Sequence, residues 1–208
     1  MQGLIGKKIG MTQVFTEDGT VIPVSVIKAG PCPIVQVKTQ KKDGYNAVQL
    51  AFEEIPPTRA NLPTIGHFRR AGLPPYRYLQ EFRVDNPEEY KQGEFVDVSI
   101  FKDVKKVNVT GRTKGRGYAG VVKRHGFSGG SKTHGSKSHN VPGSIGMAAY
   151  PSRVLKGQKL PGRMGFEKFT VKNLEVIEVD TENNLLFVKG AVPGARNGIL
   201  RITISQKA

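Results

Sequence analysis

The chain has no tryptophan, a single cysteine and no long apolar run in its 208 residues. Cys32 has no partner for an internal disulfide, which is the cysteine usage expected in a reducing compartment. No window approaches the roughly 18 apolar residues of a membrane span, and the N-terminus lacks the apolar segment of a signal peptide. We therefore expect a cytoplasmic protein without a membrane partner.

Acidic residues are missing altogether between positions 104 and 166. Removing the 13 bases of this segment from the chain's 32 leaves 19 bases against 17 acids elsewhere, a net charge of only +2. The segment carries +13, and charge of one sign destabilises a compact state unless a partner supplies counter-charge. A polyanion is therefore the expected partner. The 13 bases are Lys105, Lys106, Arg112, Lys114, Arg116, Lys123, Arg124, Lys132, Lys137, Arg153, Lys156, Lys159 and Arg163.

Glycine is concentrated in the same segment, which holds 13 of the chain's 25 glycines. Because glycine disfavours helices, the amphipathic basic helix of a membrane-surface protein is not expected here. Apolar and aromatic residues such as Tyr118, Phe127 and Tyr150 are interleaved with the bases, which is not typical of a solvated linker. We expect an arm that is mobile alone and becomes ordered on its partner.

The nearly neutral remainder has the alternation and composition of β-strands. Asp18-Gly19 is a two-residue turn signal that joins strands predicted at 11–15 and 21–27. Prolines interrupt residues 54–94, which are interpreted as an irregular insertion with little sheet and short helices at most, at 64–71 and 87–91. Further strands are predicted at 34–37, 47–52, 95–101, 107–109, 171–179, 185–188 and 199–204.

Short strands near both ends of the chain predict a mainly β fold, a small barrel or sandwich. The predicted body comprises residues 1–104 and 167–208. Residues 105–166 leave the sheet and return to it as a long, basic, glycine-rich extension. Fixing both ends of such a segment lowers the entropy lost when it is ordered on a partner.

One glycine motif, Gly115-Arg-Gly117-Tyr-Ala-Gly120, has the spacing of a dinucleotide-binding loop. That interpretation needs a helix of about a dozen residues next, whereas only five residues separate Gly120 from Gly126. The alternative is that the glycines let backbone N–H groups approach phosphates. The bases around them are Lys114, Arg116, Lys123 and Arg124.

His125, His134 and His139 have no cysteine or carboxylate nearby, which argues against a zinc site. Base stacking or hydrogen bonding to phosphate suits them better, and a solvated loop histidine remains the alternative for each. The segment also lacks the paired carboxylates of acid–base or two-metal catalysis and a G-x-S-x-G elbow. We expect no enzyme activity, no metal, no cofactor and no small-molecule substrate.

The residues predicted to bind nucleic acid are of three kinds: Lys and Arg, which carry positive charge, glycines, and histidines. Bases neutralise phosphates, and imidazole rings stack on unpaired bases. The set is Lys105, Lys106, Arg112, Lys114, Gly115, Arg116, Gly117, Lys123, Arg124, His125, Lys132, His134, Lys137, His139, Arg153, Lys156, Lys159 and Arg163.

The same segment resembles a known family. Phe101, Asn108, the run Gly111-Arg-Thr-Lys-Gly-Arg-Gly-Tyr-Ala-Gly120 and Arg124 reproduce the signature spacing of the large-subunit ribosomal protein L-three family. The similarity extends to GLIGKKIGMTQVFTEDGTVIPVSVI near the N-terminus, to 141–146 and to 184–194. It covers essentially the full chain, which resembles a bacterial member.

The resemblance implies a β-barrel body similar to that of translation factors, with a long internal extension that passes through ribosomal RNA toward the peptidyl-transferase region. It implies a structural constituent of the large subunit, a primary binder of large-subunit ribosomal RNA near its 3′ end that helps to start assembly. The implied protein neighbours are L-fourteen and L-nineteen.

Two positions depart from the family pattern. Met147-Ala148-Ala149 stand where many bacterial relatives carry a methylated glutamine, so that modification is not expected here. His125 stands where relatives often have a tryptophan.

Two other classes of protein remain as alternatives to the resemblance. One is a chromosomal or other general nucleic-acid-binding protein, which would not co-migrate with large ribosomal subunits. The more distant one is a hydrolase or nuclease, which an activity assay with and without Mg²⁺ would reveal.

Overall fold

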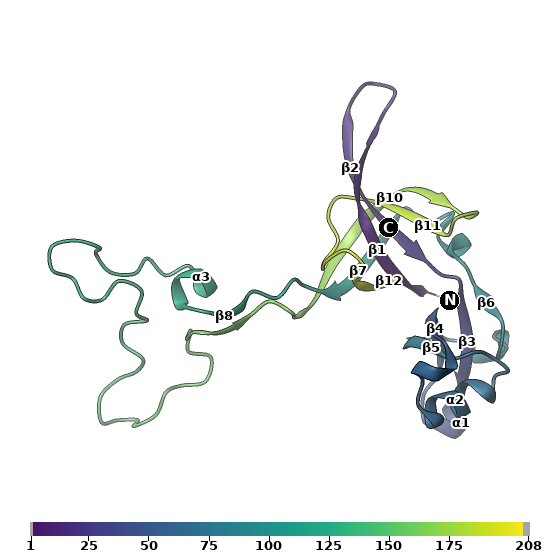
Figure 1. Ribbon diagram of the computed structural model, residues 1–208, viewed down its shortest axis with the longest axis horizontal. Coiled ribbons are helices and arrows are strands. Elements are labelled where there is room, and N and C mark those ends of the chain that lie inside the picture. The colour runs from purple at the N-terminus through teal and green to yellow at the C-terminus, as the bar shows by residue number, and fades with distance from the viewer. Residues whose placement is uncertain (1, 206–208) are drawn as a thin grey trace. The chain divides into compact units, whose positions relative to one another are not determined.

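The computed structural model describes residues 2–205 and closes six strands into a β-barrel (Figure 1). The order around the barrel is β1-β12-β7-β10-β11-β2, and every neighbouring pair is antiparallel. Alternate side chains such as Val107, Val109, Leu200 and Ile202 point inward and are fully buried. The prediction of a mainly β fold with a small barrel is confirmed. The strands are β1 (Gly3–Phe15), β2 (Val21–Ala29), β7 (Lys106–Arg112), β10 (Lys168–Asp180), β11 (Leu185–Lys189) and β12 (Ile199–Ile204).

Gly111 shows why the barrel wall needs a residue without a side chain. Its cross-strand partner in β12 is Leu200, which is fully buried. A Cβ on Gly111 would lie 2.7 Å from Leu200 Cδ2 and 3.2 Å from Pro193 Cγ. Any larger residue would therefore displace a side chain of the core.

The hairpin between β1 and β2 turns where it was predicted, but Glu17 and Asp18 occupy the centre of the turn and not Asp18-Gly19, because the Gly19 N–H group donates to Thr16 O at 2.9 Å. Gly19 has φ +76°, a left-handed conformation that glycine adopts without steric cost. The Thr16 N–H group donates to Thr20 O at 3.0 Å and closes the turn. β1 begins at Gly3, earlier than predicted, because its glycines interrupt the apolar alternation without interrupting the strand.

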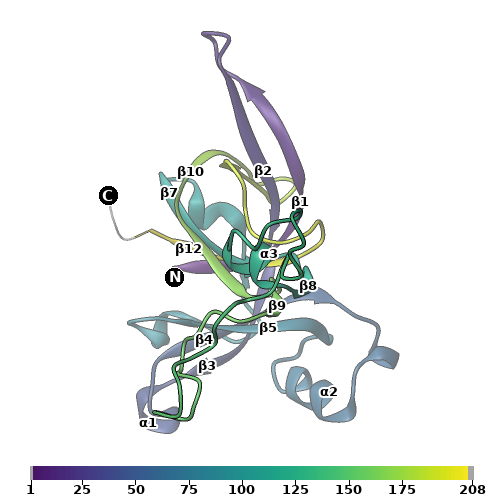
Figure 2. The same ribbon diagram turned by 90° about the vertical axis from the view of Figure 1, so that its left-hand side faces the viewer.

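A second sheet, with the order β5-β4-β3-β6, belongs to the same body (Figure 2). Two of the predicted strands lie in it, as β3 (Cys32–Lys38) and β4 (Ala47–Glu54). β5 (Tyr76–Arg83) pairs with β4 from Ala47↔Arg83 to Glu54↔Tyr76. The interpretation of residues 54–94 as having little sheet is therefore wrong at β5. The two prolines before Tyr76 precede the strand and do not break it, which is a position that a sheet tolerates.

Short helices fill the connections of this second sheet. α2 (Leu62–Arg69) overlaps the helix predicted at 64–71 and buries Phe68 in a small cluster with Val35 and Ala51. Over residues 2–205, no helix has the length and apolar character of a membrane span. The other short helices are α1 (Gln40–Asp43), η1 (Pro57–Arg59) and η2 (Pro87–Glu89).

Residues 95–101 do not form the strand that their apolar content predicted. Only β6 (Phe95–Val96) pairs, with Cys32 and Pro33 of β3, and Val98–Phe101 form the 3₁₀ helix η3. Val98 and Phe101 are three residues apart, a spacing that places them on one face of such a helix, and both are fully buried. The prediction of a strand was wrong because Val96, Val98 and Ile100 alternate as in a strand, whereas the fully buried Val98 and Phe101 are three residues apart.

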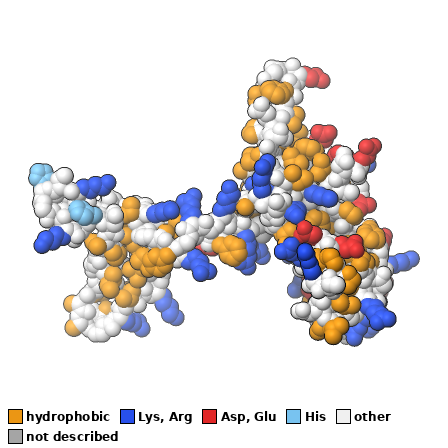
Figure 3. Space-filling view, viewed as in Figure 1, with side chains coloured by type: hydrophobic (Ala, Val, Ile, Leu, Met, Phe, Trp, Pro, Cys, Tyr) orange, Lys and Arg blue, Asp and Glu red, His pale blue; other side chains and the backbone are white. Residues whose placement is uncertain are grey.

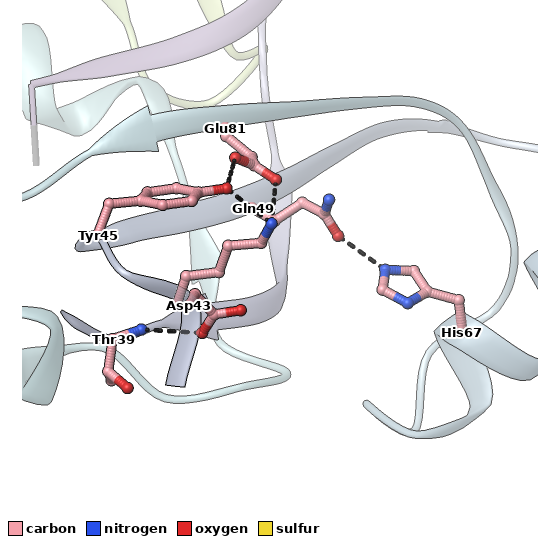
Figure 4. Close-up of polar contacts among 7 residues, drawn as sticks. Thr39, Asp43, Tyr45, Gln49, His67 and Glu81 are labelled. Carbon is pink, nitrogen blue, oxygen red and sulfur yellow. Dashed lines mark hydrogen bonds and ion pairs between the residues drawn. The ribbon is translucent and has the colours of Figure 1, made fainter. Parts of the chain in front are cut away.

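A set of polar contacts connects the strands and α2 of the second sheet (Figure 4). Lys38 Nζ lies 2.8 Å from Glu81 Oε1 and donates to Tyr45 Oη at 2.8 Å, while the Tyr45 hydroxyl donates to Glu81 Oε2 at 2.8 Å. The bond from Lys38 holds the pKa of Glu81 below its ordinary value, and the same bond raises the pKa of Lys38. His67 Nε2 of α2 lies 2.7 Å from Gln49 Oε1 of β4. These partly buried contacts connect β3, β4 and β5 with the turn at Tyr45 and with α2.

Residues 113–167 form a compact unit separate from the body described above. The barrel borders it on both sides in sequence, since Arg112 at the end of β7 pairs with Lys168 at the start of β10. β7 therefore contains Lys106 and Arg112, which the sequence had placed in the extension 105–166 rather than in the body 1–104.

Candidate nucleic-acid interface

The unit 113–167 starts and ends with two chain segments that run side by side. The Thr113 N–H group donates to Glu167 O at 2.9 Å. β8 (Gly117–Ala119) then pairs with β9 (Gly162–Met164) in an antiparallel ladder. This paired region, residues 113–119 and 162–167, is here called the stem.

Arg124 and His125 join the helix after β8 to the returning chain. They lie at the end of α3 (Val121–His125). Arg124 Nη1 donates to Leu160 O at 2.8 Å, and His125 Nε2 lies 3.1 Å from the same oxygen. A Cβ on Gly162 would lie 2.6 Å from Arg124 Nη1, so this glycine leaves the space that the guanidinium group occupies. Two residues predicted to bind nucleic acid thus make structural contacts inside the unit.

The glycine motif at 115–120 does not have the surroundings of a dinucleotide site. α3 is five residues long and ends at Gly126, which has φ +73°. The strand β8 pairs antiparallel with β9, whereas a dinucleotide-binding loop connects a strand of a parallel sheet to a longer helix. These two features exclude the dinucleotide interpretation.

The irregular loops beyond α3 are held by close contacts between backbone segments. The Gly130 N–H group donates to His139 O at 3.0 Å, and His139 Nδ1 lies 2.9 Å from Ser131 O. A Cβ on Gly130 would collide with the carbonyl oxygen of Ser138. The lack of a Cβ at Gly130 therefore lets two backbone segments lie in close contact.

Positive charge in this unit has no internal compensation. Of the 13 bases in the acid-free segment, Lys105, Lys106 and Arg112 lie outside residues 113–167, which leaves ten against the single acid Glu167. Within the described part of the chain, none of these ten bases has an acidic partner. All but Arg124 are exposed, and Figure 3 shows Lys and Arg side chains spread over the unit. The charge is therefore accessible to an anionic partner.

The structure divides the predicted binding residues between the two units. Lys105 lies in the turn before β7, and Lys106 and Arg112 occupy the two ends of that strand. The partly buried Arg124 and His125 belong to α3. The remaining members are exposed in 113–167: Lys114, Gly115, Arg116, Gly117, Lys123, Lys132, His134, Lys137, His139, Arg153, Lys156, Lys159 and Arg163.

Large exposed aromatic side chains accompany these bases. Tyr118 is 77% exposed and lies opposite Arg163 in the β8–β9 ladder, and Tyr150 is 86% exposed. Exposed rings beside arginine suit stacking on unpaired nucleotides. Tyr118 was absent from the predicted binding set, although its place inside the glycine motif was a signal for it.

The histidines of the unit do not converge on one point. His125 and His139 contact different carbonyl oxygens, and His134 lies in an exposed turn with φ +56°. Among residues 2–205, no group of three or more His, Cys, Asp or Glu side chains is arranged to hold a metal ion. The chemistry of the unit is therefore that of charge, backbone amides and aromatic faces.

Comparison with known proteins gives a consistent picture. The family model described as "Ribosomal protein L3" matches residues 83–185. "Large ribosomal subunit protein uL3" of Petrotoga mobilis is 54% identical over 208 residues, which cover 100% of this chain and 97% of the relative. The protein of the same name from Carboxydothermus hydrogenoformans is 55% identical over 201 residues, covering 97% and 96% of the two chains. The one from Corynebacterium jeikeium is 50% identical over 208 residues, covering 100% and 95%.

The chain belongs to the ribosomal protein L3 family. The part matched by the L3 family model contains all of unit 113–167 together with β7 and β10, the strands that border it. The glycine-rich stem, its arginine contact and the acid-free loops thus lie within the part of the chain that the L3 family model matches.

Proposed function

We propose that this L3 family protein is a structural constituent of the large ribosomal subunit that binds large-subunit ribosomal RNA through residues 105–166. The observation that carries the proposal is the unit 113–167, in which ten bases face a single acid and none has an acidic partner within the described chain. Folded RNA supplies the counter-charge that the protein itself lacks.

The proposed binding residues have two roles. The exposed bases of the stem and loops contact phosphates, with the backbone of Gly115 and Gly117 allowing close approach. Arg124 and His125 position the stem by way of Leu160 O, and Tyr118 offers a stacking surface. Lys105, just before β7, and Lys106 and Arg112, at the two ends of β7, are further bases of the proposed binding set. No residue has a catalytic role in this proposal.

The finer assignment follows the family. The proposed RNA site lies near the 3′ end of the large-subunit RNA, and binding there helps to start subunit assembly. Residues 105–166 reach toward the peptidyl-transferase region and support RNA geometry without taking part in chemistry. L-fourteen and L-nineteen are the proposed protein neighbours.

Sedimentation of a cell extract containing a tagged chain tests the proposal. The chain is expected in the large-subunit peak, and ultraviolet irradiation of that peak is expected to crosslink peptides from 113–167 to ribosomal RNA. Nuclease treatment before sedimentation should release it from the peak. A chain that sediments with chromosomal DNA, or that stays at the top of the gradient in untreated extract, would overturn the proposal.

A further inference from the structure

The distal part of the β1–β2 hairpin is a ribbon of two strands only (Figure 1). β1 pairs with β12 over Gly3–Lys7, and β2 pairs with β11 over Val24–Lys28. Residues 11–22, here called the hairpin tip, pair with no third strand among residues 2–205. Such a ribbon is marginally stable alone and leaves backbone N–H and C=O groups open to a partner.

One face of the hairpin tip is apolar and exposed. Phe15 pairs with Val21 and Gln13 with Pro23, so strand alternation places Met11, Gln13, Phe15 and Val21 on the same face. Phe15 is 62% exposed, and Met11 and Val21 are each 49% exposed. A cluster of large exposed apolar side chains marks an interaction surface.

The charge of the hairpin tip is opposite to that of the chain as a whole. The 19 residues between Lys8 and Lys28 contain no base, although 32 bases in 208 residues would place about three there. The turn instead carries Glu17 and Asp18, both exposed. Because phosphate contacts from Lys and Arg dominate binding to nucleic acid, this surface is unsuited to RNA.

We propose that the hairpin tip docks on a folded protein whose contact face is apolar and bordered by Lys or Arg. Met11, Phe15 and Val21 form the apolar centre of the contact, and Glu17 and Asp18 meet the bases at its edge. A second copy of this chain is disfavoured, since each copy carries +15. The inference rests on the proposed function, because it takes the partner to be another protein of the same ribosomal particle.

A photo-crosslinking amino acid at Gln13 tests this inference in the intact particle. Gln13 is exposed on the apolar face, and the matched control is Thr12, the exposed neighbour whose side chain points to the opposite face. After irradiation of purified large subunits, the Gln13 probe is expected to crosslink to one protein, at a peptide with apolar residues flanked by Lys or Arg. The Thr12 probe is expected to give much less of that product.

Two variants in the Gln13 probe background make the test specific. Phe15→Ser, and separately the pair Glu17→Lys with Asp18→Lys, are each expected to lower the crosslink yield by about tenfold, as loss of a central or charge-paired contact does. The control Glu182→Lys reverses an exposed acid in another turn and should leave the yield unchanged.

The possible outcomes separate this inference from the proposed function. Crosslinks to RNA or to a second copy of the chain would overturn the inference, as would no product or a yield that neither variant lowers. In each of those cases the chain would still be found in the large subunit, so the proposed function would stand. A chain absent from the particle would overturn both.

Discussion

At the scale of single residues, the same basic chemistry serves two purposes in this chain. Lys123 and Arg124 are adjacent in α3 and carry the same charge. Lys123 is exposed, whereas the Arg124 guanidinium donates to Leu160 O at 2.8 Å. The structure therefore separates a base that faces solvent from one that holds the unit together.

Replacing Arg124 with alanine is expected to speed amide hydrogen exchange in α3 and β9 by about fivefold, because a charge-assisted bond between α3 and Leu160 O, two residues before β9, is lost. Hydrogen exchange of the free chain by mass spectrometry measures the effect. The control Lys123→Ala should leave exchange unchanged while still weakening RNA binding. Equal exchange in the two variants would show that the Arg124 contact does not hold the stem.

No signal in the sequence distinguished these two bases. Both are basic residues in one short helix. Which of them finds an acceptor depends on the position of Leu160, and more than thirty irregular residues separate Leu160 from α3. The sequence also held no sign that Gly162, by its lack of a Cβ, makes room for the Arg124 side chain. Contacts across a long loop are set by tertiary structure, which periodicity does not report.

At the scale of elements, most strands of the barrel were predictable because apolar and polar residues alternate along them. Val107 and Val109 in β7 alternate with exposed or partly exposed residues, and residues 199–204 were predicted with the bounds that β12 has. β5 was missed because its alternating side chains include Arg77, Glu81 and Arg83 and the strand follows two prolines. Its membership of the sheet depends on pairing with β4, which is a tertiary effect.

The buried face of η3 gives an element-scale prediction. Phe101→Ala is expected to lower the free energy of unfolding by about 3 to 5 kcal/mol, because the ring is fully buried in the core. Phe95→Ala, six residues earlier, should cost less than about 1 kcal/mol because that side chain is 53% exposed. Urea unfolding of the free chain measures both values. Similar losses for the two variants would restore the strand interpretation of 95–101.

The contact between Lys38 and Glu81 gives the second sheet a pH dependence. The folded pKa of Glu81 is lowered by Lys38, so its contribution to stability is present above the unfolded value of 4.5 and is lost as the pH falls through the folded value. The pKa of Lys38 is raised in the folded chain. Its contribution to stability is therefore fully present below the unfolded value of 10.5 and is lost as the pH rises through the folded value. The melting temperature of the chain should therefore exceed that of the Glu81→Gln variant at neutral pH, by a small margin because both groups are partly exposed.

Thermal unfolding at a series of pH values checks this dependence. The difference between the two proteins should shrink as the pH is lowered from about 5 toward 2. Glu88→Gln, at an exposed position, is the matched control and should follow the unmodified chain at every pH. A difference that stays constant into strong acid would contradict the role of the Glu81 carboxylate.

At the scale of the whole molecule, the two units differ in charge. The body contains most of the acids and a closed core that joins the barrel to the second sheet, and the unit 113–167 contains ten bases and one acid. The charge imbalance was evident in the sequence, whereas the stem, the position of Tyr118 and the membership of Lys106 and Arg112 in a barrel strand required the structure. The central claim is that the RNA affinity lies in this one unit.

The register of the barrel allows that unit to be removed cleanly. Arg112 and Lys168 are cross-strand partners, so an Asn-Gly turn in place of residues 113–167 would connect β7 and β10 as a hairpin. We expect the shortened chain to keep cooperative unfolding, because the core residues of the body are untouched.

The most direct test compares the salt dependence of binding to large-subunit ribosomal RNA for the full chain and the Asn-Gly chain. With about eight phosphate contacts, the logarithm of the affinity of the full chain should fall with the logarithm of salt concentration at a slope of about −6, and the shortened chain should bind weakly with a slope no steeper than about −2. Equal slopes for the two chains, with the shortened one still folded, would contradict the assignment of the RNA-binding charge to residues 113–167.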